Sequence, residues 1–314
     1  MQKTPVLCVA GPTATGKTAL AVRLAEALGG EVISMDSMQV YRRMDIGTAK
    51  PGLDERAGIP HHLIDIVEPT EPFTVAQYAA LAVQTAREVF DRVRLPILSG
   101  GTGFYLRALT HGLSLGGVPS DPTLRERLKA EAATPDGRRA LHERLRQIDP
   151  EAAARLHEND VQRVSRAVEV FTLTGKPISM QEEQTRDCPF SLCLIGTTME
   201  RGHLYERINA RVDAMMAQGL LREVKELLDA GVPPSAQAMQ GIGYKELATV
   251  ALSGAPLHDA VTAVKQNTRH YAKRQWTWFR AEPRFTWLDM ENTASEAQAL
   301  RIGEAFWKEA KQWI

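Results

Sequence analysis

The feature that most constrains this chain is a phosphate-binding loop near its N-terminus. Residues 11–18 read GPTATGKT, a complete G-x-x-x-x-G-K-[ST] motif. Its glycines let the backbone turn tightly, so that successive N–H groups can point at phosphate oxygens. Lys17 supplies a positive charge for the terminal phosphates, and Thr18 supplies a hydroxyl ligand for Mg²⁺. The predicted diphosphate-binding residues are Gly11, Pro12, Thr13, Ala14, Thr15, Gly16, Lys17 and Thr18.

The segments around the loop predict a parallel α/β sheet. Residues 6–10, VLCVA, are a short apolar run typical of a buried parallel strand. Residues 18–28 have a helical pattern, and the N-terminal dipole of that helix would face the anion. Further strands are expected at 31–34 and 95–99, with a helix at 75–93 between them. Alternating strands and helices indicate a doubly wound sheet, which binds ligands at the carboxyl ends of its strands.

The middle of the chain differs from the rest. Residues 121–174 are rich in charges of both signs and have helical patterns without a strand candidate, whereas strand character returns at 191–198. We therefore expect an all-helical insertion domain at 116–189 in a P-loop NTPase-like α/β core made by residues 1–115 and 190–314. Further helices are expected at 201–217, 220–230, 244–252 and 257–281, with a last strand at 284–288.

The composition is that of an ordinary globular protein. Lysine and arginine number 38 and so do aspartate and glutamate, so a nucleic-acid site would have to be a local basic patch. Cys8, Cys188 and Cys193 form no C-x-x-C pair, which predicts neither a disulfide framework nor a zinc site. No apolar stretch approaches the roughly 20 residues that span a bilayer, and we expect no signal peptide before the first strand. We expect a monomeric cytoplasmic enzyme.

Asp36 follows the second expected strand and is the first catalytic candidate outside the loop. A carboxylate at this edge of the sheet could coordinate Mg²⁺ through water or act as a general base. A turn or helix-capping role is equally compatible with its position. Ser37, Met38 and Gln39 come next and supply groups of the sort that read the edge of a nucleobase.

Three further positions carry weaker signals. Thr102 lies in the glycine-rich turn 100–103, where another molecule could approach closely, although without further context a simple strand-to-helix connection is the favoured explanation. Arg211, on an expected helix, suits bidentate contact with phosphate or a plain surface position. His61 and His62 are adjacent and lack a carboxylate at ligand spacing, so we expect structural or loop residues rather than a metal site.

A basic and aromatic stretch lies near the C-terminus. Residues 265–281, KQNTRHYAKRQWTWFRA, contain five lysines or arginines and no acidic residue. Basic charge with interleaved aromatic rings is typical of nucleic-acid binding, which combines phosphate neutralisation with base stacking. The alternative is an amphipathic helix with Trp276 and Phe279 in the core. The candidate nucleic-acid contacts here are Arg269, Lys273 and Arg274.

Six segments together resemble the bacterial tRNA dimethylallyltransferase family. The match runs in order over nearly the full length, and its combination of motifs is far more specific than the phosphate loop alone. Residues 116–189 are the least distinctive part. The matching segments are GPTATGKT at 11–18, DSMQVYRRMDIGTAKP at 36–51, HHLID at 61–65, GGTGFYLRAL at 100–109, GIGYKEL at 241–247 and TRHYAKRQWTWFR at 268–280.

The resemblance implies transfer of a dimethylallyl group from dimethylallyl diphosphate to N6 of the adenosine immediately 3′ of the anticodon, position 37, which forms N6-(dimethylallyl)adenosine. It implies Asp36 as the general base, Lys17, Thr102 and Arg211 as further catalytic residues, and Mg²⁺ on Thr18. It also implies contact between the helical insertion and tRNA. The implied tRNA-binding residues are Asp36, Ser37, Met38, Gln39, Thr102, Leu124, Asp160, Val161, Gln162, Arg163, Val164, Gln240, Gly241, Ile242, Gly243, Tyr244 and Lys245, in addition to Arg269, Lys273 and Arg274.

One experiment separates this function from two alternatives, a P-loop small-molecule or nucleoside kinase and a nucleotide-gated RNA-binding module. The protein is incubated with undermodified tRNA, Mg²⁺ and either ATP or dimethylallyl diphosphate, and the tRNA nucleosides are weighed by mass spectrometry. We expect a gain of one C5H8 unit on adenosine, with the prenyl donor only. Phosphate transfer from ATP would favour the kinase, and tight RNA binding without product would favour the binding module.

Overall fold

The computed structural model describes residues 3–110, 120–182 and 188–313. The chain divides into two compact units, one made of residues 1–110 and 188–314 and the other of residues 111–187. The domain boundaries expected at 116 and 189 fall within or beside the segments outside the described residues, so they stay predictions. None of the described helices combines the length and the apolar character that crossing a membrane requires.

The first unit contains a six-stranded parallel sheet, which confirms the predicted α/β fold. The strands are ordered β3-β2-β4-β1-β5-β6. Ala10 of β1 pairs with Gly100 of β4, and Ser34 of β2 pairs with Ser99, so the carboxyl ends of three neighbouring strands lie level. The strands are β1 (Thr4–Ala10), β2 (Gly30–Ser34), β3 (His61–His62), β4 (Leu95–Gly100), β5 (Phe190–Thr198) and β6 (Thr286–Asp289).

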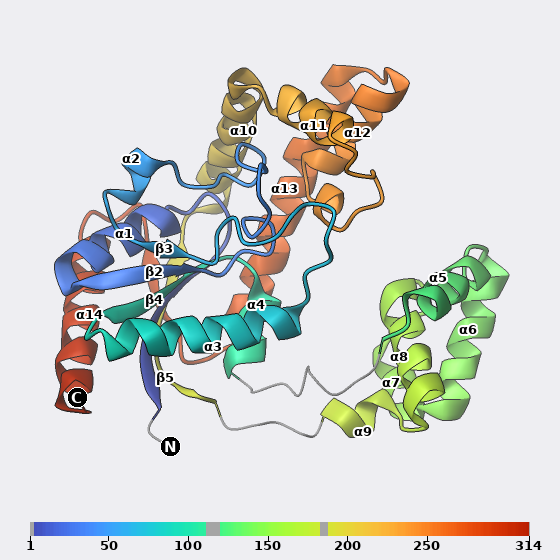
Figure 1. Ribbon diagram of the computed structural model, residues 1–314, viewed down its shortest axis with the longest axis horizontal. Helices are drawn as coiled ribbons and strands as arrows, with labels where there is room; N and C mark the ends of the chain where they lie inside the picture. Colours follow the sequence, from blue (N-terminus) through green and yellow to red (C-terminus); the bar gives the residue numbers. More distant parts are fainter. Residues whose placement is uncertain (1–2, 111–119, 183–187, 314) are drawn as a thin grey trace. The chain divides into compact units, whose positions relative to one another are not determined.

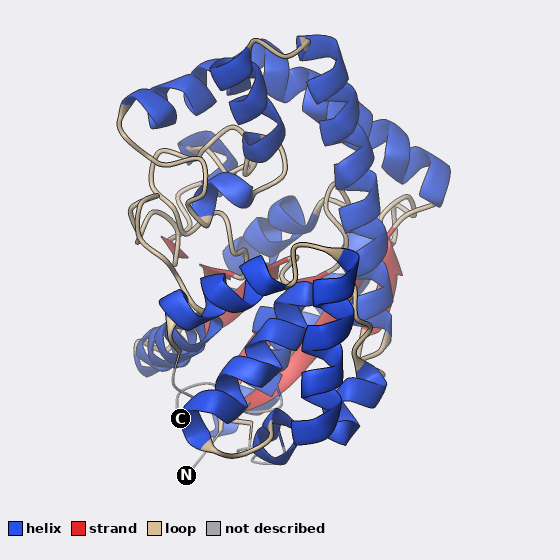
Figure 2. Ribbon diagram, turned by 90° about the vertical axis from the view of Figure 1, so that its right-hand side faces the viewer, coloured by secondary structure: helices blue, strands red, loops and turns tan. Residues whose placement is uncertain are grey.

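Helices cover both faces of the sheet (Figures 1 and 2). Successive side chains of a strand point to opposite faces, so Val6 and Cys8 belong to one hydrophobic core, and Leu7 and Val9 to the other. This double burial explains why β1 is apolar throughout rather than alternating. The first face is covered by α3 (Val75–Asp91) and α4 (Gly103–Thr110), and the second by α1 (Lys17–Leu28) and α14 (Ser295–Ala310).

The pair His61 and His62, expected to be structural or loop residues, forms the short edge strand β3 beside β2. His62 Nε2 lies 2.7 Å from Oε2 of Glu31, and Arg92 donates to the same oxygen at 2.7 Å. A two-residue strand is too short to leave a periodic pattern, which is why the sequence does not reveal it. Among the described residues, no group of three or more histidines, cysteines or acids could hold a metal ion.

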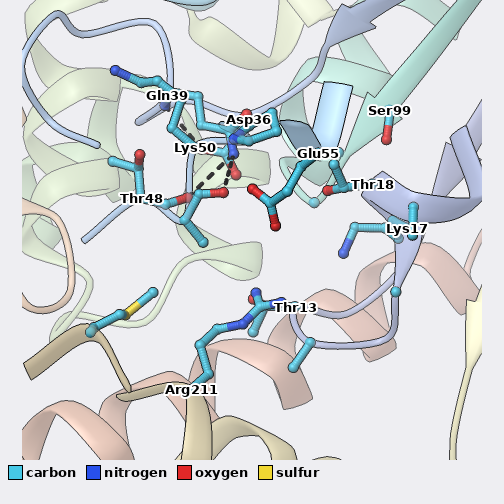
Figure 3. A pocket seen from close by; sticks show the side chains of 18 of the residues that line it. Thr13, Lys17, Thr18, Asp36, Gln39, Thr48, Lys50, Glu55, Ser99 and Arg211 are labelled. Carbon is cyan, nitrogen blue, oxygen red and sulfur yellow. Dashed lines mark hydrogen bonds between the residues drawn. The ribbon is translucent and has the colours of Figure 1, made fainter. Parts of the chain in front are cut away.

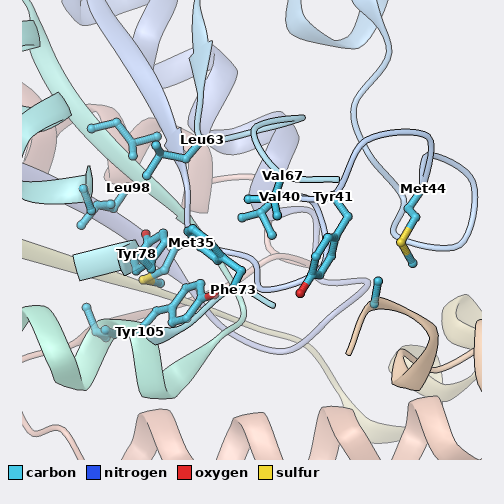
Figure 4. Packing of buried hydrophobic residues seen from close by; sticks show 14 of the residues in the cluster. Met35, Val40, Tyr41, Met44, Leu63, Val67, Phe73, Tyr78, Leu98 and Tyr105 are labelled. Atoms are coloured by element: carbon cyan, nitrogen blue, oxygen red, sulfur yellow. The ribbon is translucent and has the colours of Figure 1, made fainter. Parts of the chain in front are cut away.

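An aromatic cluster holds the end of β2 in place (Figure 4). Tyr78 of α3 and Tyr105 of α4 stack with ring centroids 3.7 Å apart and planes 10° apart. The Tyr78 hydroxyl donates to the carbonyl oxygen of Ser34 at 3.1 Å, and Met35 is fully buried in the same core. Because this packing fixes the last residues of β2, it fixes the position at which Asp36 leaves the sheet.

Four further helices follow β5, and their bounds agree with the sequence-based expectation to within one residue. Ala14 of the phosphate loop packs with Ile208 and Ala272 in a small apolar cluster, so two of these helices lie directly against the loop. The last strand begins two residues later than expected, at Thr286. The helices are α10 (Arg201–Gln218), α11 (Leu220–Asp229), α12 (Tyr244–Ser253) and α13 (Leu257–Arg280).

In its described part the second unit is entirely helical, as predicted. Its helices pack around an apolar core to which Leu128, Leu145 and Val168 contribute. Asp121, Thr134 and Asp149 cap the helices that begin with proline. The helices are α5 (Pro122–Glu131), α6 (Pro135–Ile148), α7 (Pro150–Arg155), α8 (Val161–Thr174) and α9 (Ile178–Glu182).

The tRNA contacts that the resemblance implies in this unit fall into two groups. Leu124 and Val164 are buried in the helical core, so their side chains have a packing role instead of facing a partner. Asp160 caps α8 by accepting the N–H of Arg163 at 3.3 Å. The side chains of Gln162 and Arg163 are exposed on the first turn of the helix. Only this second group is open to a macromolecule.

A buried glutamate, Glu169, joins α5 to α8. Its carboxylate accepts hydrogen bonds from Arg125 at 2.9 Å, from Arg166 at 2.9 Å and from the Asp121 amide at 2.8 Å. Burial by itself raises the pKa of Glu169, but these hydrogen bonds outweigh it and hold the pKa below the usual value. The ionised carboxylate therefore stabilises this unit.

Replacing this carboxylate, as in Glu169→Gln, should destabilise the helical unit by roughly 2 kcal/mol, because the hydrogen bonds from Arg125 and Arg166 lose their charged acceptor. Hydrogen exchange of the α5 and α8 amides in the full chain measures this as a roughly 30-fold faster rate. Because the pKa of Glu169 is lower in the folded protein, its carboxylate stabilises the fold fully above the pKa of about 4.3 that a glutamate has in the unfolded chain. This stabilisation is lost as the pH falls below that value. The variant and the wild type should therefore have similar protection at acid pH. Equal protection at neutral pH would contradict this role. Glu126→Gln, which removes an exposed ion pair with Lys129, is the control and should change little.

Candidate active site

A cavity of about 430 Å³ opens at the level carboxyl ends of β1, β2 and β4. Its lining includes the phosphate loop, Asp36 and the turn after β4, and α10 contributes Arg211. Figure 3 shows Lys17 and Arg211 extending toward the same space from the loop and from α10. The position agrees with the expectation that ligands bind at this edge of a parallel sheet. We call this space the loop cavity.

The phosphate loop keeps its shape through contacts with β5. A side chain at Gly11 is impossible because its Cβ would lie 2.5 Å from the carbonyl oxygen of Thr197, and φ there is +149°. The Thr15 hydroxyl lies 2.6 Å from the Thr197 hydroxyl and donates to the carbonyl of Pro12 at 2.9 Å. The Thr15 side chain therefore supports the loop from behind instead of facing a phosphate.

Two cations in the loop cavity lack a counter-ion. Burial lowers the pKa of Lys17 to about 7; the charge on Arg211 acts in the same direction, and Asp36 opposes it. Burial likewise lowers the pKa of Arg211, as does repulsion from Arg207. Neither Lys17 nor Arg211 forms an ion pair with another residue in the part of the chain that the structure describes. A multiply charged anion is the ligand that would relieve this excess of positive charge.

Asp36 is held in a fixed orientation at the end of β2. Its Oδ1 accepts the N–H groups of Met38 at 2.8 Å and Gln39 at 3.4 Å. Burial raises the pKa of Asp36, although these two hydrogen bonds and the charge on Lys17 lower it. The raised pKa makes this carboxylate a stronger base than an exposed aspartate.

Thr102 lines neither this cavity nor the second one described below. Its hydroxyl accepts the N–H of Ser37 at 3.0 Å, so it acts on the segment that begins with Asp36 rather than on a ligand. The amide of Gln39 is similarly engaged, accepting from Ser34 at 3.0 Å and donating to the carbonyl of Thr48 at 3.3 Å. Both residues support the site from within the protein.

A second cavity of about 330 Å³ shares Asp36 with the first. Its wall combines residues 36–38 with residues 240–244 and with Arg274 of α13, and it includes apolar side chains from several helices. Groups bound in the two cavities would meet at the shared residues. We call the second space the acceptor cavity. The residues that line both cavities are Thr13, Asp36, Thr48, Ala49, Arg211, Met215 and Tyr271.

The basic stretch of α13 has a buried side and an exposed side. Phe279 is fully buried in the core, as the amphipathic alternative expects, whereas Lys273 and Arg274 are exposed. Arg269 donates to Asn209 at 2.7 Å. Lys245, at the other side of the acceptor cavity, is exposed as well.

Gln275 is a functional residue that sequence reasoning missed. Its Oε1 accepts the N–H of Thr13 at 2.8 Å, and its Nε2 donates to the carbonyl of Gly101 at 2.8 Å. A Cβ at Gly101 would lie 2.1 Å from Nε2, which explains the glycine. The Thr13 N–H, which the motif assigns to phosphate, is thus already used. Gln275 ties the phosphate loop, the turn after β4 and α13 together.

Glu223 of α11 is a second residue that the sequence did not reveal. Its carboxylate accepts the N–H groups of Asp45 at 2.9 Å, Ile46 at 2.8 Å and Gly47 at 3.1 Å, and the Tyr244 hydroxyl donates to it at 2.6 Å. These four hydrogen bonds hold the loop that continues into both cavities. The signal for such a residue is a buried acid that forms no ion pair with another described residue and accepts backbone N–H groups instead, which only coordinates reveal.

The donor set of the loop cavity suits Mg²⁺. Thr18, Ser99 and Asp36 place two hydroxyl groups and a carboxylate in its wall. Mg²⁺ favours oxygen ligands and commonly takes one or two carboxylates together with the phosphates of a ligand and several waters. These residues therefore fit a magnesium ion that binds together with a diphosphate.

The Gln275→Ala variant should weaken binding of inorganic diphosphate. The N–H of Thr13 and the buried carbonyl of Gly101 would lose their partner, which costs about 1–3 kcal/mol, or roughly 5-fold to 150-fold in Kd when the whole cost falls on the bound state. Calorimetric titration in the presence of Mg²⁺ measures the change. Gln275→Glu keeps the acceptor for Thr13 but places a carboxylate in the cavity wall, opposite the Gly101 carbonyl, so it should weaken diphosphate binding further. An unchanged Kd for Gln275→Ala would show that the loop does not depend on this bridge.

Comparison with known proteins gives one consistent family. Residues 39–282 match the family model described as IPP transferase, and residues 4–65 match the model of isopentenyl transferase. The chain is 50% identical over 303 residues to the tRNA dimethylallyltransferase of Pelotomaculum thermopropionicum, covering 96% of each chain.

Solved structures agree with the sequence relatives. The full-length tRNA isopentenylpyrophosphate transferase of Bacillus halodurans is 44% identical, with a TM-score of 0.74 over 99% of both chains. A eukaryotic dimethylallyltransferase acting on tRNA is 28% identical, with a TM-score of 0.75 over 95% of this chain and 78% of the other. With a phosphate loop, a shared carboxylate and these relatives over its whole length, this chain belongs to the tRNA dimethylallyltransferase, or IPP transferase, family.

Proposed function

We propose that this chain transfers a dimethylallyl group from dimethylallyl diphosphate to N6 of the adenosine immediately 3′ of the anticodon, position 37 of tRNA. The observation that carries the proposal is that Asp36 lines both cavities. A donor diphosphate in the loop cavity and an adenine in the acceptor cavity would then bring their reacting atoms together beside one carboxylate. Family membership supports the same chemistry.

The loop cavity suits a leaving diphosphate. Negative charge builds on the diphosphate oxygens as the bond to the allylic carbon breaks, and Lys17 and Arg211 lie where they would stabilise it. Because neither cation has another counter-ion among the described residues, their stabilisation grows as that charge develops. Mg²⁺, which we propose is held by Thr18 with the phosphates, would supply further positive charge to the leaving group when bound.

The acceptor nitrogen needs help because its lone pair is delocalised into the adenine ring. Asp36, with its raised pKa, would take a proton from the amine as the carbon–nitrogen bond forms. The adenosine must leave its stack to reach the acceptor cavity, at a cost of a few kcal/mol that is smaller in a loop than in a duplex.

Contacts with the rest of the tRNA follow from the exposed groups. Residues 240–244 and Arg274 line the acceptor cavity, and Lys245 and Lys273 are exposed around it, so we propose that they bind the anticodon stem-loop. We propose the same role for residues 160–163 at the start of α8, where the side chains of Gln162 and Arg163 are exposed. A small-molecule kinase would leave the acceptor cavity and these charges without use. We further propose that the enzyme acts as a cytoplasmic monomer.

The Asp36→Asn variant tests the base. The amide oxygen can still accept from Met38 and Gln39, so the fold and RNA binding should persist, while single-turnover prenyl transfer should fall by about 100-fold to 10,000-fold. The wild-type rate should also fall as pH drops through the raised pKa of Asp36, because the protonated acid is no base. The control is Asp54→Asn, an exposed acid on α2 (Leu53–Arg56). Near wild-type transfer by Asp36→Asn would refute the assignment.

A further inference from the structure

Two aromatic side chains, Phe104 and Trp278, stand exposed beside the site. Phe104 is 45% exposed and Trp278 is 36% exposed. Their ring centroids lie 6.4 Å apart with the planes at 88°, an edge-to-face pair that joins α4 to α13. Among the described side chains they are the only phenylalanine, tyrosine or tryptophan rings in the exposed class. Nothing in the fold or in the two cavities requires aromatic surface here.

The pair is fixed to the backbone that supports Asp36. A Cβ at Gly103 would lie 2.2 Å from Cδ1 of Trp278, so the indole rests directly on the turn that follows β4. Thr102 of this turn accepts the N–H of Ser37, the residue after Asp36. The aromatic pair therefore keeps a constant position relative to the carboxylate.

Unpaired cations flank the aromatic pair. Arg274 precedes Trp278 by one helical turn, lines the acceptor cavity and lies over the Tyr271 ring with 5.7 Å between Cζ and the centroid. Arg107 follows Phe104 by three residues and is exposed. In the described parts of the chain neither arginine has an acidic partner within ion-pair distance. The surface thus offers two aromatic rings, each within about one helical turn of an arginine that forms no ion pair with another described residue.

We propose that Phe104 and Trp278 form a stacking platform for an unpaired base of the anticodon loop adjacent in space to the adenosine in the acceptor cavity. The proposal rests on the proposed function in taking RNA as the partner. When the adenosine leaves its stack, a neighbouring base loses a stacking surface. The exposed ring of Phe104 or Trp278 would replace that surface. Stacking tolerates any base, whereas the arginines engage the phosphates on either side.

The test measures the Kd of an anticodon stem-loop without donor, so it does not depend on catalysis. Trp278→Ala should weaken binding by about 5-fold to 150-fold, the range for one base on one ring, and Trp278→Phe should lose less. Leu257→Ala is the matched control, since Leu257 is 42% exposed on the same helix. It lies about 30 Å from Trp278 along the axis and should leave the Kd unchanged. An unchanged Kd for inorganic diphosphate shows that Trp278→Ala leaves the loop cavity intact.

A double-mutant cycle, with one change in the protein and one in the RNA, distinguishes the loss of one stacking contact from a general change in the structure of the binding surface. Abasic sites are placed one at a time along the anticodon loop and each is titrated with wild type and Trp278→Ala. We expect one position at which the abasic site weakens binding to wild type but has almost no further effect on Trp278→Ala. Additive penalties at every position, or a wild-type Kd for Trp278→Ala, would overturn the platform.

Failure of the platform and failure of the proposed function give different results. Wild type that binds the stem-loop but transfers no prenyl group contradicts the proposed function, and the cycle still decides the platform from binding constants. If the wild type transfers the prenyl group, but the binding penalties of the abasic sites and of Trp278→Ala are additive at every position, only the platform is contradicted. Wild type that does not bind the stem-loop contradicts both.

Discussion

The level carboxyl ends of β1, β2 and β4 are the constraint on which the rest of the site depends. Parallel pairing with Ala10 opposite Gly100 and Ser34 opposite Ser99 sets three loops side by side. One loop offers backbone amides and Lys17, the second offers Asp36, and the third offers the glycine turn that lets α13 approach. A shift of one residue between β2 and β4 would turn alternate side chains to the wrong face and separate the carboxylate from the phosphate loop.

The two cavities provide different environments on the two sides of Asp36. The loop cavity contains cations that form no ion pairs with other described residues, which suits the negative charge of a leaving diphosphate. The acceptor cavity has mixed apolar and polar walls, which suits a bound nucleobase. Gln275 and Glu223 fix segments of the cavity walls, because each binds backbone groups of segments far away in sequence. This division explains how one phosphate loop, common to many kinases, can serve an alkylation.

Local patterns were sufficient to predict the phosphate loop, the strands of the sheet and the helices after the insertion. They work because each depends on residues near one another in the chain: glycine turns, apolar runs and helical periodicity. The same logic fails for Gln275 and Glu223, whose partners lie elsewhere in the chain, and for β3, which has two residues.

The resemblance implied roles that the coordinates refine. Thr102 supports Ser37 from outside the cavities, and Leu124 belongs to the helical core. Burial and hydrogen-bond partners decide such roles, and a motif specifies neither.

The measurement that tests the account most directly is a crystal structure of the protein with Mg²⁺, an unreactive thiolodiphosphate analogue of the donor and an anticodon stem-loop. The account predicts the diphosphate on the loop near Lys17 and Arg211, and the adenine amine within hydrogen-bond reach of Asp36, about 2.6–3.2 Å. A diphosphate outside the loop cavity, or an adenine whose amine faces away from Asp36, would contradict it.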